Sequence, residues 1–206
     1  SKDKYTIAVS GTHGKTTTTA MLAGILIEAK IDPTVIVGSI LKSHNTNFIG
    51  GTGNYFLVEA DEYRRSFLNL FPTILVINNI DRDHLDYYKD LEDIQSAFHE
   101  LALRVPSDGY IVCDPNHAHI QPVIAGALAK IIDYSKIENV PELQFPGRHN
   151  IENAQVAMAV AKILNIEDAV INTALKNFQG TARRFEYKGE SRRGVLVYDD
   201  YAHNPQ

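Results

Sequence analysis

The residues best suited to chemistry form the run GTHGKT, which extends from Gly11 to Thr16. Two glycines let the backbone curl so that several N–H groups point inward, and a helix that begins at the lysine adds partial positive charge. A strand-like apolar stretch precedes the run and a helix-like stretch follows it, the context that a phosphate-binding loop requires. We predict that Lys15 reaches the outer phosphates of a nucleotide and that Thr16 binds Mg²⁺.

This loop is a shortened form of the full phosphate-loop pattern, because Val9 stands where that pattern has a glycine. The alternative interpretation is a glycine-rich turn between a strand and a helix, with a lysine on the surface. Four consecutive threonines follow the lysine, and such β-branched residues are poor choices for a helix interior. A segment that departs this far from local preferences usually serves a ligand.

Acidic side chains follow two other strand-like stretches. YFLVEADEY supplies Glu59, Asp61 and Glu62, and VINNIDRDHLDYY supplies Asp81, Asp83, His84 and Asp86. The carboxyl ends of parallel strands meet at one edge of a sheet, and carboxylates are the ligands that Mg²⁺ prefers. The two clusters could therefore hold a metal ion beside the loop. Solvated loops are the alternative for both, and on chemistry alone His84 could equally indicate a transition metal.

The elements that must position these residues alternate along the chain. Strand-like runs cover residues 6–10, 33–38, 55–60, 73–79, 109–114 and 130–135. Helix-like runs cover residues 15–29, 90–105, 118–129, 149–166 and 167–178, and residues 38–54 form a polar, glycine-rich loop. A hairpin follows, with its turn near residues 188–194. This alternation predicts an α/β fold with a mostly parallel sheet, covered by helices on both faces, and a small β-hairpin near the C-terminus.

Composition bounds the class of protein. The 206 residues are 44% hydrophobic and 22% charged, as in ordinary soluble domains, and the net charge of −5 comes with no basic stripe for a nucleic acid. No apolar run approaches the roughly 20 residues of a membrane span. The single cysteine, Cys113, rules out an intrachain disulfide and favours a reducing cytosol. Its strand-like surroundings indicate a buried structural thiol.

Taken together, SGTHGKTTT, VEADE and NNIDRDHLD resemble the Mur ligase family, which builds the peptide stem of bacterial peptidoglycan. FPGRHNIENAQVA, GTARRFE and YDDYAHNP resemble the remaining motifs of that family, in the same order. The resemblance implies an enzyme of three domains, which hold a UDP group, ATP and the incoming amino acid. It implies that residues 1–198 are the central ATP-binding domain and that residues 199–206 are a hinge into a third domain. The N-terminal UDP-binding domain would be absent from this chain.

The resemblance also implies an activity. Members of the family activate a carboxylate with ATP and then form an amide through an acyl phosphate, with release of ADP and phosphate. His13 and the EADE sequence are most similar to the branch that joins L-alanine to UDP-N-acetylmuramate. A murein tripeptide ligase of cell-wall recycling shares these features. Two further interpretations are a nucleotide-binding module without ligase activity and a metal-dependent hydrolase.

Roles for individual residues follow from the resemblance. It implies that Lys15 neutralises the β- and γ-phosphates, that Thr16 and Glu59 bind magnesium, and that His84 binds a second magnesium ion. It implies nucleotide contacts from Gly11, Thr12, His13, Gly14, Lys15, Thr16, Thr17, His149, Asn150, Asn153, Arg184 and Asp199. Asp200 shares the ribose role with Asp199, and Arg183 shares the phosphate role with Arg184. Without the family, Asn153 would be a polar residue on the exposed face of a helix. Arg64 stands where the family commonly has an acidic residue, near the expected muramyl site.

Overall fold

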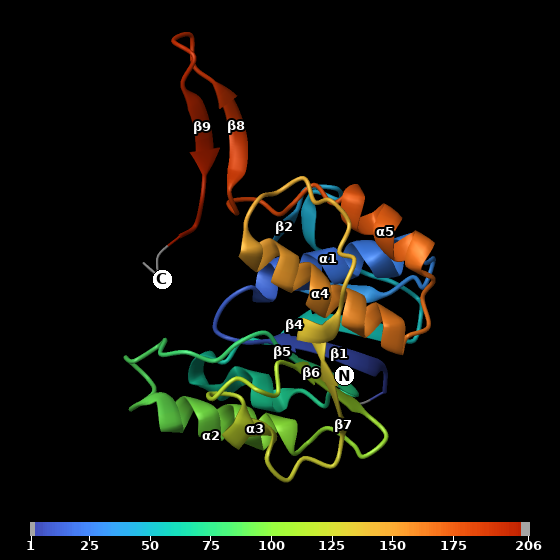
Figure 1. Ribbon diagram of the computed structural model, residues 1–206, viewed down its shortest axis with the longest axis vertical. Coiled ribbons are helices and arrows are strands. Elements are labelled where there is room, and N and C mark those ends of the chain that lie inside the picture. Colours follow the sequence, from blue (N-terminus) through green and yellow to red (C-terminus); the bar gives the residue numbers. More distant parts are fainter. Residues whose placement is uncertain (1–2, 203–206) are drawn as a thin grey trace.

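The computed structural model describes residues 3–202. Seven strands form one sheet in the order β3-β2-β4-β1-β5-β6-β7, and only β3 runs antiparallel to its neighbour. Their bounds are β1 (Tyr5–Ser10), β2 (Thr34–Leu41), β3 (Thr46–Ile49), β4 (Tyr55–Glu59), β5 (Ile74–Ile77), β6 (Tyr110–Cys113) and β7 (Lys130–Asp133). The predicted α/β fold with a mostly parallel sheet is confirmed (Figure 1).

Helices cover both faces of this sheet. Helices α1 (Lys15–Glu28), α4 (Arg148–Ile163) and α5 (Asp168–Lys176) pack over the face to which Ile7 and Val9 point. Helix α2 (Leu91–Ala102) and the short α3 (Gln121–Ile124) pack over the other face, beside Ala8. Two short helical segments, η1 (Tyr63–Asn69) and η2 (Tyr134–Lys136), complete the body of the domain. Within residues 3–202, no helix is long and apolar enough to cross a membrane.

The central strands are buried on both faces, which explains why their sequences read as continuous apolar runs rather than as alternating ones. The threonine run is tolerated in α1 because its buried hydroxyls find acceptors. Thr19 Oγ1 donates to the carbonyl of Lys15 at 2.8 Å, and Thr18 Oγ1 donates to Asn153 Oδ1 at 3.1 Å. Thr16 donates to a carboxylate on β4, so three of the four threonine side chains have a defined partner.

Two predicted segments differ from the structure. The expected loop 38–54 is wrong, since β2 continues to Leu41 and turns back into β3, an edge strand. The expected helix 118–129 is also wrong, because α3 contains only four residues. Pro122 lies in its first turn, and Gly126 with φ of 75° ends the segment. The remaining strands and helices lie where the sequence predicts them, with ends that differ by a few residues.

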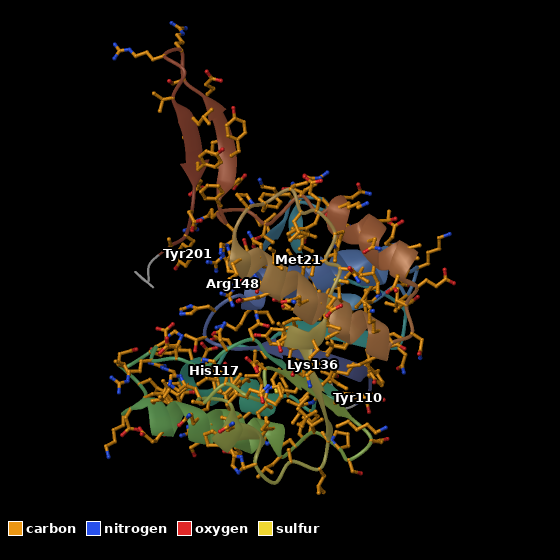
Figure 2. The ribbon with its side chains drawn as sticks, viewed as in Figure 1. Met21, Tyr110, His117, Lys136, Arg148 and Tyr201 are labelled. Carbon is orange, nitrogen blue, oxygen red and sulfur yellow. The ribbon has the colours of Figure 1, made fainter. Side chains whose placement is uncertain are left out.

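The predicted hairpin is present as a separate two-stranded sheet of β8 (Glu186–Glu190) and β9 (Leu196–Asp199). It extends away from the body of the domain, with side chains exposed along both strands (Figures 1 and 2). Its base is fixed to the body because Glu186 Oε2 accepts from the backbone N–H of Arg183 at 2.8 Å and Glu186 Oε1 lies 3.4 Å from Lys42 Nζ.

Candidate functional site

The sheet order brings the three chemically interesting segments together. Strand β1 leads into the glycine loop, and its two neighbours are β4, which ends at Glu59, and β5, which leads to Asn78. The register pairs Val9 with Glu59, and the N–H of Asn78 donates to the carbonyl of Ser10 at 3.0 Å. All three segments therefore leave the sheet at its carboxyl edge, where ligands bind in open α/β sheets.

The loop between β1 and α1 needs its glycines. Gly11 has φ of 129° and Gly14 has φ of 81°, conformations that side chains with a Cβ rarely adopt. A Cβ on Gly14 would also lie 2.4 Å from Asn153 Oδ1, so the backbone approaches α4 closely. Helix α1 begins immediately after Gly14, which directs its N-terminal N–H groups toward the loop.

Two asparagines after β5 hold this loop in place. Asn79 Oδ1 accepts from the N–H of His13 at 2.8 Å, and the carbonyl of Asn79 accepts from the N–H of Thr12 at 3.1 Å. Asn78 Nδ2 donates to the carbonyl of His13 at 3.2 Å. Sequence reasoning did not select either asparagine. Their position directly after a buried strand was the available signal.

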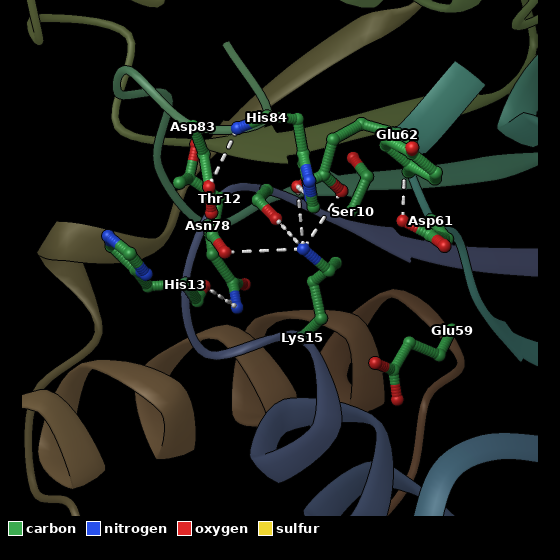
Figure 3. A network of polar contacts seen from close by, with 12 residues as sticks. Ser10, Thr12, His13, Lys15, Glu59, Asp61, Glu62, Asn78, Asp83 and His84 are labelled. Carbon is green, nitrogen blue, oxygen red and sulfur yellow. Dashed lines mark hydrogen bonds and ion pairs between the residues drawn. The ribbon is translucent and has the colours of Figure 1, made fainter. Parts of the chain in front are cut away.

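Lys15 folds back across the mouth of the loop. Its Nζ donates to the carbonyl of Gly11 at 2.6 Å, to the carbonyl of Thr12 at 3.2 Å and to Glu62 Oε1 at 2.8 Å (Figure 3). Glu62 is only 2% exposed. Burial raises the pKa of the Glu62 carboxyl, and the nearby charge of Lys15 opposes that effect. Glu62 is thus a buried acidic partner of the lysine.

Glu59 lies below the Lys15 ammonium group in Figure 3, next to the first turn of α1. Its Oε1 accepts from Thr16 Oγ1 at 2.9 Å, and its Oε2 accepts from the N–H of Gly38 at 2.6 Å. A hydroxyl and a carboxylate oxygen in contact at the end of a phosphate loop are suitable ligands for Mg²⁺. The donor chemistry of Thr16 and Glu59 therefore fits a magnesium ion.

His84 approaches Glu62 in this structure. Its Nε2 lies 3.7 Å from Glu62 Oε1, and one donor atom each from Asp61, Glu62 and His84 lies within 4.8 Å of the others. The imidazole packs against the ring of Tyr63 at a centroid distance of 5.0 Å, and the Arg64 guanidinium lies 5.4 Å from the centroid of the same tyrosine. His84 and Glu59 thus occupy different sides of the lysine (Figure 3).

A cavity of about 490 Å³ opens beside the loop, between the start of α1 and the start of α4. His13, Gly14, Thr16 and Thr17 line it from the loop, and His149, Asn150 and Asn153 line it from α4. Asn153 is only 7% exposed, so the interpretation that places it on an exposed helix face is wrong.

The other walls of the cavity are largely aromatic. Tyr134, Phe145 and Phe178 come from η2 and from two connecting segments, and sequence reasoning selected none of them. Flat apolar surfaces of this kind, beside the amide of Asn153, suit a planar heterocycle.

The base of the hairpin closes the far end of this cavity. Arg184 and Asp200 both line it, and Asp200 Oδ2 accepts from the N–H of Phe185 at 2.8 Å. Asp199 does not line the cavity, because it belongs to the β8–β9 ladder and lies 3.9 Å from Lys188. Of the two aspartates considered, Asp200 is therefore the one placed at the cavity.

The buried thiol is where the sequence predicts it. Cys113 is fully buried in β6, and burial raises its pKa to about 12. It lies outside the cavity, so it takes no part in this site.

The strand, glycine loop and helix at the centre of a parallel sheet define an α/β domain of the phosphate-loop type. The chain belongs to the Mur ligase family, since the family model for the Mur ligase middle domain matches residues 9–161. The chain is 44% identical to the UDP-N-acetylmuramate–L-alanine ligase of Clostridium kluyveri, over 98% of this chain and 50% of that protein. It spans about half the length of the curated relatives it matches.

Solved structures agree with this assignment. The UDP-N-acetylmuramate-alanine ligase of Thermotoga maritima superposes with a TM-score of 0.82 at 29% identity, over 99% of this chain and 52% of that one. A murein peptide ligase from Psychrobacter arcticus superposes with a TM-score of 0.80, also at 29% identity, over 99% of this chain and 53% of that one.

Proposed function

We propose that this chain is the ATP- and magnesium-binding central domain of a ligase that joins L-alanine to UDP-N-acetylmuramate in peptidoglycan synthesis. The observation that carries the proposal is the junction of two sites. The glycine loop, whose Thr16 is bonded to Glu59, lines one side of the cavity with aromatic walls through His13, Gly14, Thr16 and Thr17. The first suits a triphosphate and the second a nucleobase, so one nucleotide would fill both.

In the proposed reaction, a carboxylate oxygen of the muramyl group attacks the γ-phosphorus of ATP, and the bond from that phosphorus to ADP breaks. The amine of L-alanine then attacks the acyl carbon, phosphate leaves, and the amine gives up a proton. The first step is phosphoryl transfer, in which positioning and charge neutralisation supply most of the catalysis. Lys15 would neutralise the outer phosphates, and the N–H groups at the start of α1 would bind their oxygens.

Magnesium would be held by Thr16 Oγ1 and the Glu59 carboxylate, which already lie 2.9 Å apart. His84 is the proposed ligand of a second magnesium ion, and in this structure Asp61 and Glu62 are the carboxylates beside it. Bound magnesium would offset the negative charge that spreads over the phosphate oxygens. Backbone N–H groups already donate to the carboxylates of Glu59 and Asp61, which orients both before any substrate arrives.

Within the cavity, we propose that the adenine lies between the aromatic walls and the amides of Asn150 and Asn153. A primary amide can donate to one ring nitrogen while it accepts from the exocyclic amine. Arg184 would approach phosphate oxygens, and Asp200 would approach the ribose, because both line the same cavity. ATP and a sugar nucleotide as substrates would place this reaction in the cytoplasm.

The test uses the full-length protein and measures release of phosphate from ATP. The proposal expects release that depends on both UDP-N-acetylmuramate and L-alanine. A murein tripeptide is the competing acceptor amine, because the murein peptide ligase of Psychrobacter arcticus has a similar fold and level of identity. Turnover with the tripeptide but not with L-alanine would replace the proposed substrate. If the protein bound ATP but turned over neither L-alanine nor the tripeptide, it would instead be a nucleotide-binding module.

We also propose that residues 1–198 are the central domain and that residues 199–206 lead into another domain. Residues 203–206, which include the end of the DDYAHNP motif, lie outside the described part of the chain. One exposed face of the hairpin supports the proposal that another domain follows. Phe185, Tyr187, Leu196 and Tyr198 are all about half exposed. The ring of Tyr198 stacks on that of Phe185 and makes a tilted contact with that of Tyr187. An isolated two-stranded sheet is marginal in water, so a following domain would cover this face.

This domain proposal has its own test. The 206-residue chain alone is expected to bind ATP weakly and to show no L-alanine-dependent phosphate release. Robust alanine-dependent turnover by this chain alone would contradict it.

A further inference from the structure

The ion pair between Lys15 and Glu62 has no part in the proposed magnesium binding at Thr16 and Glu59 or in the proposed phosphate binding at Lys15, although Glu62 also lies beside His84. Lys15 Nζ lies 2.8 Å from Glu62 Oε1 and 2.8 Å from Glu62 Oε2. The lysine side chain is 14% exposed and the glutamate side chain 2% exposed. Such a pair is shielded from solvent, so the Coulombic attraction between its two charges is stronger than in a surface ion pair.

The lysine has no donor left for a ligand. An ammonium group has three N–H donors, and those of Lys15 are directed at the carbonyls of Gly11 and Thr12 and at Glu62 Oε1. A nucleotide phosphate that engages Lys15 must displace at least one of these acceptors. The two carbonyls belong to the loop itself, whereas Glu62 reaches it from the start of η1, 47 residues along the chain.

Glu62 is held firmly in this position. It immediately precedes η1, its carbonyl accepts from the hydroxyl of the buried Tyr88, and its side chain is buried. The two residues that follow Tyr63 have φ of 51° and 56°, left-handed conformations that turn the chain sharply just after Glu62. The surrounding fold therefore keeps a carboxylate at the place where a phosphate would contact the lysine.

We propose that Glu62 is an internal anion that competes with nucleotide phosphate for Lys15. This inference rests on the proposed nucleotide site. When Lys15 turns to a phosphate, Glu62 loses its counter-charge while more negative charge arrives beside it. The Glu62 carboxylate therefore weakens the binding of a nucleotide that carries no divalent cation. A divalent cation bound to the nucleotide supplies the missing positive charge and so removes this effect. Glu62 thereby makes the loop select the metal complex of the nucleotide over the free nucleotide.

The test compares the affinity of the full-length protein for ATP in EDTA and in excess Mg²⁺. Glu62→Gln keeps the shape of the side chain and removes its charge, so it is expected to tighten ATP binding in EDTA about tenfold. The ratio of ATP affinity in excess Mg²⁺ to ATP affinity in EDTA is expected to shrink by the same factor. Glu138→Gln is the matched control, because Glu138 is exposed and lies outside both the cavity and the cluster of Asp61, Glu62 and His84. It removes the same charge and is expected to change both affinities less than twofold.

A second variant separates competition for Lys15 from general repulsion. In a Lys15→Met background, Glu62→Gln is expected to lose most of its effect on metal-free binding, whereas plain repulsion would persist there. Glu62→Asp keeps the charge but withdraws it from Lys15, and intermediate tightening is expected, which also covers the case in which the glutamine variant fails to fold.

Two outcomes would overturn the inference. Unchanged or weaker ATP binding in EDTA by folded Glu62→Gln would contradict the competition while leaving the nucleotide site intact. Absence of ATP binding by the unaltered protein in both conditions would overturn the nucleotide site and the competition together.

Discussion

The Thr16 hydroxyl donates a hydrogen bond of 2.9 Å to Glu59 Oε1 across 43 residues of sequence. The contact exists because β4 pairs directly with β1, so the residue that ends β4 meets the first turn of the helix that follows β1. This pair is the centre of the proposed magnesium site.

Glu59→Gln removes the charge of that pair and keeps its size. We expect the full-length enzyme to need at least about tenfold more Mg²⁺ for half-maximal activity, because a neutral amide is a much weaker ligand for a hard cation. Glu138→Gln, at an exposed position outside the cavity, serves as the charge-matched control. Equal Mg²⁺ requirements for the two variants would exclude Glu59 as a ligand.

Gly38→Ala tests the orientation of Glu59 without altering the carboxylate. An added Cβ at Gly38 would lie 2.6 Å from Glu59 Oε1 and 2.8 Å from Oε2. The end of a flexible side chain can move away, so we expect little loss of stability but a raised Mg²⁺ requirement. A titration of activity with Mg²⁺, beside a thermal unfolding curve, separates the two effects. An unchanged Mg²⁺ requirement would show that Gly38 does not position Glu59.

Gly24→Ala is the matched control and a prediction in its own right. Gly24 lies within α1, and a Cβ there would meet no atom within 4 Å. Alanine removes the backbone entropy cost of glycine in a helix, so we expect the free energy of unfolding to rise by about 0.5–1 kcal/mol. Denaturant unfolding measures this change, and a lower midpoint would indicate an unrecognised close contact.

Cys113 is expected to resist alkylation in the native protein. Its pKa is raised to about 12 by burial, so the reactive thiolate is scarce at mildly alkaline pH, and the side chain is also inaccessible. Labelling with iodoacetamide should be slow in buffer and fast in denaturant. Rapid stoichiometric labelling under native conditions would place the thiol at the surface instead.

The pKa of Glu186 leads to a prediction for acidic pH. Its folded-state pKa is lowered from 4.5 to about 2, chiefly by the hydrogen bond from the N–H of Arg183 and then by Lys188. A carboxyl group whose pKa is lowered in the folded state stabilises the fold at pH values above its ordinary pKa. This contribution is lost as the pH falls from 4.5 toward 2. The effect on global stability is small, since the carboxylate anchors a surface hairpin and its lysine partners, Lys42 and Lys188, are partly exposed to solvent.

The measurement for this prediction is the amide resonance of Arg183, recorded while the pH is lowered from neutral. It should stay constant through the ordinary range of glutamate titration and move only in stronger acid. Glu186→Gln should abolish the movement. A midpoint at the ordinary glutamate value would show that the hairpin base is not held by this carboxylate.

The sequence predicts the parts of this site that depend on local rules. The glycine loop is a contiguous motif, and Glu59 could be placed because acidic residues at the ends of parallel strands share one edge. The pairing of Glu62 with Lys15 could not be predicted, because it depends on the path of η1, where Arg64 and Arg65 adopt positive φ values. Neither residue type favours that conformation, so nothing in the local sequence indicates the turn.

The nucleobase cavity was only partly predictable for a related reason. Asn153 could be placed through the family resemblance, but Tyr134, Phe145 and Phe178 come from η2 and two connecting segments that meet only in the folded chain. Likewise, β3 was missed because Thr46–Ile49 is a short edge strand whose central residues, Asn47 and Phe48, are both exposed, and its pattern resembles a polar loop. Contacts between segments that are distant in sequence determine both the cavity and β3.

The most direct test of the central claim is a crystal structure of the full-length protein with Mg²⁺ and a non-hydrolysable ATP analogue. We predict that the triphosphate curls around Gly11–Lys15, that Lys15 contacts its outer phosphates, and that an ion binds Thr16 and Glu59. An analogue bound elsewhere, with Lys15 still paired to Glu62 and no ion at Glu59, would contradict the account.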